Sequence, residues 1–122
     1  MTTADELVQA LVARFPVLRP AYEEHLRDAG ELLPHVIFGI GEGFTDRVVD
    51  AYMQRDPADA LDWLAVLEFL EAHFDQGDRD VDELLVTSFL DALPGPTRPG
   101  HGLVDELPNR LHTRFNLIRP CG

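Results

Sequence analysis

Apolar residues recur at every third or fourth position along most of the chain, which is the spacing of an amphipathic helix. The pattern is densest from Asp56 to Leu93, where it predicts two helices joined by the tight connection Gln76-Gly77-Asp78. In each helix the apolar residues occupy two faces. They are Trp63, Val66, Leu67, Leu70 and Phe74 against Leu61 and Phe69 in the first helix, and Val81, Leu84, Leu85, Ser88, Phe89 and Ala92 against Val86, Leu90 and Leu93 in the second. We therefore expect the rest of the chain to cover this central helix pair, residues 56–93, on two sides.

Capping and stop signals delimit the first two helices. Thr3-Ala4-Asp5-Glu6 has the form of a capping box, in which two side chains satisfy each other's backbone amides. The helix that follows should end before Pro16, because the residue before a proline is pushed out of the helical region. A second helix is predicted from Pro20 to Ala29, with Gly30 as its stop.

A third helix is predicted from Pro34 to Met53, and its first-turn proline costs little because the amide there would lack a partner anyway. Gly39, Gly41 and Gly43 interrupt this helix. A glycine inside a helix costs about 0.8–1 kcal/mol relative to alanine. The helix therefore either breaks at the glycines or uses them to let another helix approach closely, and we favour close approach with some local distortion.

The remaining boundaries complete an all-α prediction. Asp56-Pro57 reads as a cap and first-turn proline that start the first central helix. Residues 94–102 form a loop rich in proline and glycine, and a last helix is predicted over residues 103–115, followed by a loose tail. We expect residues 1–122 to form one compact helical domain of five to six helices in antiparallel pairs, with a HEAT-like arrangement as one possibility.

Length and cysteine content bound the class of protein. The chain has 122 residues, of which 45% are hydrophobic, enough for a core that needs no disulfide or metal. Its single cysteine, Cys121, has no partner for an internal disulfide. The N-terminus is acidic, unlike a signal peptide, and no apolar run approaches the roughly 20 residues that cross a membrane. We expect a cytoplasmic protein that does not enter a membrane.

Negative charge is concentrated in the middle of the chain. The formal net charge is −12, and residues 31–91 alone carry 15 acidic residues against three arginines, whereas the two flanks are balanced. Such a surface repels the phosphates of DNA and RNA, which argues against nucleic acid binding. A basic protein partner would be attracted.

Two rows of carboxylates recur at helical spacing within this acidic middle. Glu42, Asp46 and Asp50 form the first row, and Glu68, Glu71 and Asp75 form the second. Each row is either a solvated helix face or a partner-binding surface. Glu71 differs from the others because it falls within the apolar arc of its helix, where it would serve as a general acid or, the simpler interpretation, be satisfied by an arginine or backbone amides.

Residues that could carry chemistry form no recognisable constellation. The five histidines never occur four residues apart on one helix, and there is no cysteine pair, so we predict neither a metal site nor a cofactor. Ser88 lies inside an apolar helix without a glycine elbow, which favours a small packing residue over a nucleophile. His35, at a helix start, is best read as a satisfied histidine. We predict no catalytic residues, and an enzyme that uses Glu71 and His35 is the weakest alternative.

One combination of segments resembles a known group of proteins. It comprises Leu32-Leu33-Pro34-His35-Val36-Ile37-Phe38-Gly39, Leu67-Glu68-Phe69-Leu70-Glu71, and Gly77-Asp78 with Val81, Leu84-Leu85-Val86 and Ser88-Phe89-Leu90. This pattern is similar to an uncharacterised bacterial all-helical family that itself resembles immunity proteins encoded beside polymorphic toxins. The resemblance covers about residues 31–93 and implies binding without an assigned chemistry.

These observations together predict a binding protein. The resemblance and the charge favour an immunity-like domain whose acidic helical surface occludes a basic partner such as a toxin, with Glu42, Asp46, Asp50, Glu68, Glu71 and Asp75 as the contact residues. The alternative is a helical adaptor that self-associates or binds a peptide in an apolar groove. Salt separates the two, because it weakens charge pairing and has little effect on apolar contacts.

Overall fold

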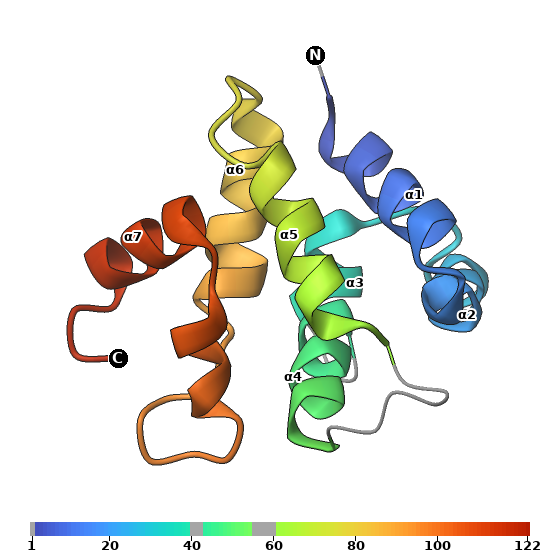
Figure 1. Ribbon diagram of the computed structural model, residues 1–122. Coiled ribbons are helices and arrows are strands. Elements are labelled where there is room, and N and C mark those ends of the chain that lie inside the picture. The colour runs from blue at the N-terminus through green and yellow to red at the C-terminus, as the bar shows by residue number, and fades with distance from the viewer. Residues whose placement is uncertain (1, 40–42, 55–60) are drawn as a thin grey trace.

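The computed structural model describes residues 2–39, 43–54 and 61–122, and all regular structure in these ranges is helical (Figure 1). Seven of the described elements are α-helices: α1 (Ala4–Arg14), α2 (Arg19–Ala29), α3 (Pro34–Gly39), α4 (Phe44–Gln54), α5 (Trp63–His73), α6 (Arg79–Leu84) and α7 (Asn109–Ile118). Three further helical elements are the 3-10 helices η1 (Pro16–Leu18) and η3 (His101–Glu106) and the π-helix η2 (Leu85–Leu90). The all-α prediction is confirmed.

The two N-terminal helices begin and end where the sequence predicts. The Thr3 hydroxyl accepts a hydrogen bond from the Glu6 amide at 3.1 Å, and the Glu6 carboxylate accepts one from the Thr3 amide at 3.4 Å. The first helix ends before Pro16, and Gly30 ends the second with a left-handed φ of 76°. Both sets of end signals act through neighbouring residues only, which explains why they can be read from the sequence.

The third predicted helix is two helices, α3 and α4. Gly43 lies outside both of them, and a Cβ there would come within 2.6 Å of the carbonyl oxygens of Ile37 and Phe38, so only glycine fits. Gly39 has a different role, because a Cβ on it would lie 3.4 Å from the Ser88 Cβ. Both alternatives considered from the sequence occur. The chain is not helical at Gly43, between α3 and α4, and Gly39 allows the close approach to Ser88. Gly41 lies outside the described residues.

The first central helix begins later than predicted. The predicted cap Asp56-Pro57 falls outside the described residues, but Leu61 and Asp62 precede the helix and are not helical. Helix α5 starts at Trp63, where the Asp62 carboxylate accepts a hydrogen bond from the Ala65 amide at 3.1 Å. The prediction that the helix starts at Asp56 is therefore wrong, because the aspartate that caps it is the one next to the apolar run.

Helix α6 continues directly into η2, and together they form the middle of the molecule (Figure 1). Leu84, Leu85, Phe89 and Leu90 are fully buried, whereas Ala92, predicted to face inward, is exposed. Helices α1 and α2 lie on one side of the α5–α6 pair and α7 on the other, with α3 packed against η2 and α4 against α5. The prediction that the central pair is covered on two sides is confirmed.

The C-terminal part departs from the prediction in two ways. The helix expected over residues 103–115 is divided into η3 and α7, because Leu107 before Pro108 takes an extended conformation. The tail, expected to be loose, is held by Arg119, whose Nη1 donates to the carbonyl oxygen of Leu93 at 2.6 Å. Leu107, Leu111 and Phe115 are buried as predicted. None of the helices in the described ranges has the length and apolar content to cross a membrane.

Candidate functional site

The first row of carboxylates lies on the outer face of α4. Asp46 and Asp50 are exposed and stand one helical turn apart, while Val48 and Val49 on the opposite side are buried. Glu42, the first member of the row, lies outside the described residues. The sequence therefore identified a solvent-exposed face of this helix.

The second row is split by the structure. Glu68 and Asp75 are exposed, but the side chain of Glu71 is only 17% exposed and is engaged by the start of α7. Its carboxylate accepts hydrogen bonds from the backbone amides of Arg110 at 2.9 Å and Leu111 at 3.0 Å, and pairs with Arg110 Nε at 3.1 Å. Arg110 Nη2 also donates to the Glu71 carbonyl oxygen at 2.7 Å.

Glu71 therefore caps a helix that is distant in the sequence. Pro108, at the N-cap position of α7, has no side chain that can accept from the free amides of the first turn, and the Glu71 carboxylate takes that place. This confirms the interpretation that an arginine and backbone amides satisfy the carboxylate. It also removes Glu71 from the set of carboxylates that face solvent.

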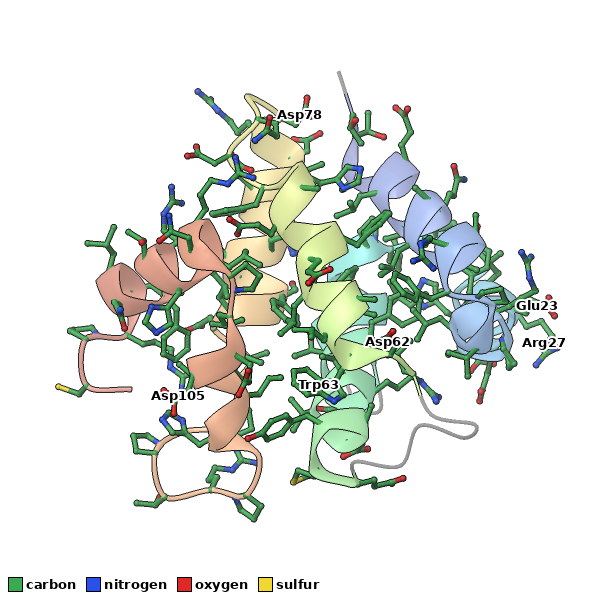
Figure 2. The ribbon with its side chains drawn as sticks, viewed as in Figure 1. Glu23, Arg27, Asp62, Trp63, Asp78 and Asp105 are labelled. Carbon is green, nitrogen blue, oxygen red and sulfur yellow. The ribbon has the colours of Figure 1, made fainter. Side chains whose placement is uncertain are left out.

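A third acidic face lies on α6. Asp80 and Glu83 are exposed at helical spacing, and Asp78 accepts a hydrogen bond from the Thr2 amide at 3.0 Å near the N-terminus. The labelled acids Glu23, Asp78 and Asp105 reach outward at the edges of the molecule in Figure 2. The carboxylates of Asp50, Glu68 and Glu83 form no ion pair with any described residue. The negative charge of these three side chains is thus left to solvent.

His35 joins the start of α3 to the π-helix. Its Nδ1 lies 2.8 Å from the Ser88 hydroxyl and 3.2 Å from that of Thr87, and Thr87 in turn donates to the carbonyl oxygen of Glu83 at 2.8 Å. Because the Thr87 hydroxyl donates its hydrogen to the Glu83 carbonyl oxygen, the Thr87 oxygen can only accept from His35, whose Nδ1 then carries the hydrogen. The Ser88 carbonyl oxygen accepts from the Thr45 hydroxyl at 2.7 Å.

The serine and histidine come together without the rest of a nucleophilic site. Ser88 is 7% exposed, and within the described ranges no carboxylate contacts His35 to orient its ring. Among the same residues, no three histidine, cysteine, aspartate or glutamate side chains lie close enough to hold a metal ion. The contacts around Ser88 instead tie α3 and α4 to the middle of the π-helix, beside the close approach of Gly39.

Sequence reasoning missed the arginines that complete these contacts. Arg110 lies 39 positions from Glu71, and Arg119 lies 26 positions from Leu93, so no local pattern links either pair. One signal was present: Glu71 sits in an apolar arc, which requires some partner. The choice among ten arginines could not be made from spacing.

Comparison with known proteins identifies the family of the chain. No curated protein and no solved structure matches the chain. A family model described as a domain of unknown function matches residues 8–112, from the first buried turns of α1 to the first turn of α7. The match spans the central pair together with the helices that cover it, and it assigns no activity. The chain belongs to this family, DUF7674.

Proposed function

We propose that the protein is a non-catalytic, cytoplasmic binding protein of the immunity type, which neutralises a basic bacterial toxin by occlusion. The observation that carries the proposal is the uncompensated charge on the outer helix faces. Asp50, Glu68 and Glu83 are exposed and form no ion pair with described residues, in a chain with a net charge of −12. Exposed charge of one sign attracts a partner of the other sign and speeds its association.

The contact surface we propose consists of Asp46 and Asp50 on α4, Glu68 on α5, and Asp75 in the turn after α5. Glu42 stays in the proposal from the sequence alone. Glu71 is left out because its carboxylate holds the start of α7. On a nuclease toxin, these acids would bind the basic groups that otherwise hold phosphates, so inhibition needs no turnover.

The experiment measures binding to the product of the adjacent gene, coexpressed with this protein, at low and high salt. Asp46→Lys/Asp50→Lys should weaken binding about tenfold or more at low salt, because each exposed pair contributes about 0.2–1 kcal/mol and reversal adds repulsion. The matched control is Glu23→Lys/Glu24→Lys, which makes the same change in charge on the exposed face of α2. Equal affinities for the α4 variant and the unmodified protein at both salt concentrations would exclude this face.

The second face needs a different substitution. Asp75 has a φ of 60°, a conformation that asparagine tolerates and lysine does not favour. Glu68→Lys/Asp75→Asn therefore changes the charge without straining the turn. If only one of the two variants loses affinity, that variant identifies the docking face.

The adaptor remains the second candidate. The exposed large apolar side chains in the described ranges are dispersed: Val17, Met53, Leu64 and Leu117 lie on η1, α4, α5 and α7, and Leu33 lies just before α3. Isolated apolar residues of this kind are common on protein surfaces. Binding that is insensitive to salt and to both charge variants would favour the adaptor.

A further inference from the structure

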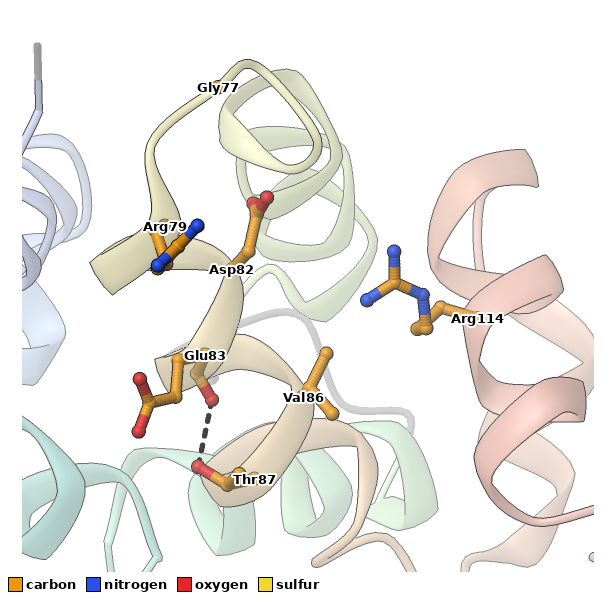
Figure 3. Close-up of a pocket in the computed structure, with 7 residues that line it drawn as sticks. All are labelled: Gly77, Arg79, Asp82, Glu83, Val86, Thr87 and Arg114. Atoms are coloured by element: carbon orange, nitrogen blue, oxygen red, sulfur yellow. Dashed lines mark hydrogen bonds between the residues drawn. The ribbon is translucent and has the colours of Figure 1, made fainter.

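A pocket of about 430 Å³ opens between α6–η2 and α7 (Figure 3). Its walls differ in charge. Arg114 reaches into the pocket from α7, Asp82 and Arg79 stand on α6, and Val86 stands on η2 below Asp82 in the view of Figure 3. The remaining lining residues are Gly77, Glu83 and Thr87.

Arg114 is positioned but not paired. Its guanidinium carbon lies 5.2 Å from the centre of the buried Phe74 ring, which holds the cation by its aromatic face. The residue is half-buried, yet its side chain forms no hydrogen bond or ion pair with any described residue. Its neighbours in the same segment behave differently: Arg110 is bound to Glu71, and Arg119 to carbonyl oxygens.

The acids that line the pocket do not neutralise Arg114. The Asp82 carboxylate accepts a hydrogen bond from the Asp75 amide at 2.8 Å and so holds the turn between α5 and α6. The Glu83 carboxylate points away from Arg114 in Figure 3. A guanidinium fixed in place, with a planar set of donors and no acceptor, is suited to an incoming oxyanion.

The surroundings decide which oxyanion fits. Two arginines and two acids line the pocket of a molecule whose net charge is −12, so a doubly charged phosphate would be repelled more strongly than a single carboxylate. Val86 offers an apolar contact next to Arg114. We propose that this pocket receives a glutamate side chain of the protein partner, with Arg114 binding the carboxylate and Val86 contacting its methylene groups. This inference depends on the proposed function in one respect, namely that the partner is a protein.

Butyrate, the free equivalent of a glutamate side chain, tests the pocket without a partner. Each arginine has one side-chain Nε–Hε group, so the assigned Nε–Hε signal of Arg114 in an NMR spectrum follows its guanidinium, and that of Arg98 serves as a comparison. At constant ionic strength, the Arg114 signal should shift and saturate with half-saturation on the order of 10 mM, a value typical of one charge-assisted contact. Butyramide, which has the same shape without the charge, should cause no shift.

Variants and a second anion sharpen the result. Arg114→Gln should abolish saturable binding, and Arg98→Gln, which changes an exposed arginine of the loop, should leave it intact. Equal, non-saturating shifts at Arg98 and Arg114 would overturn the site. Tighter binding of inorganic phosphate than of butyrate would overturn the assignment to a carboxylate. The Asp46→Lys/Asp50→Lys variant should bind butyrate as the unmodified protein does, so failure of the pocket and failure of the acidic surface are distinguishable.

Discussion

Replacing Glu71 by alanine should destabilise the fold, because the Glu71 carboxylate both caps α7 and pairs with Arg110. The loss of the cap accounts for about 0.5–2 kcal/mol and the loss of the ion pair for about 0.2–1 kcal/mol. The ion-pair figure is kept small because the Arg110 side chain is 41% exposed. We therefore expect Glu71→Ala to lower the free energy of unfolding by about 1–3 kcal/mol.

Urea unfolding followed by circular dichroism measures this loss. With a urea dependence of about 1–3 kcal/mol per molar, the midpoint should fall by about 1 M. Glu71→Gln keeps an acceptor oxygen for one amide and should lose less. Arg110→Ala keeps both amide contacts and should lose only the ion pair and the hydrogen bond from Nη2 to the Glu71 carbonyl oxygen. The matched control is Glu68→Ala on the same helix, which removes an exposed carboxylate and should stay within about 0.5 kcal/mol.

Two results would refute the reasoning. If Arg110→Ala costs as much as Glu71→Ala, the arginine and not the amide cap stabilises the contact. If Glu71→Ala costs no more than Glu68→Ala, the carboxylate does not hold α7 in solution.

Two further changes test the chain breaks and the tail. Gly43→Ala should lower the midpoint of thermal unfolding, at a cost of about 1–3 kcal/mol, because its Cβ would meet the carbonyl oxygens at the end of α3 at 2.6 Å; an unchanged midpoint would contradict the break. Arg119→Ala should cost about 1.5–3 kcal/mol, since it leaves the Leu93 carbonyl oxygen without its donor, and should expose the C-terminal residues to carboxypeptidase. Arg27→Ala, an exposed change on α2, is its control, and equal digestion of the two variants would contradict the proposed role of Arg119.

Features that depend on near neighbours were predictable. The Thr3 capping box, the Gly30 stop and the buried faces of α5 and α6 follow from short-range spacing, and the structure has all of them. The missed boundaries were choices between adjacent local signals. Asp62 competes with Asp56 as a cap, and Pro108 interrupts an apolar pattern that otherwise runs through it. In both cases the sequence contains the residue that sets the boundary, but only the packing of the chain decides which of the competing signals takes effect.

Contacts across the fold were not predictable from spacing. His35 meets Ser88 53 positions away, and Glu71 meets Arg110 39 positions away. From the sequence we interpreted each residue as structural, namely a satisfied histidine, a small packing serine and a carboxylate held by an arginine or backbone amides, but spacing did not identify their partners. Brought together with their partners, Glu71 and Ser88 satisfy backbone and side-chain groups at helix junctions. The exposure of Asp46, Asp50 and Glu68 was predictable, because an exposed helix face needs only the helical period and the charge pattern.

The arginines near the C-terminus and the exposed acids differ in where their side chains point. Arg110 donates to the carboxylate and carbonyl oxygen of Glu71, and Arg119 donates to the carbonyl oxygen of Leu93. These hydrogen bonds hold α7 and the C-terminal tail in place. Asp50 and Glu68 face outward and form no ion pair with described residues. Charge changes at these acids should therefore leave the fold intact, because no folded contact depends on them. A loss of affinity in such variants can then be read as a loss of partner contact, whereas a loss in a Glu71 variant cannot.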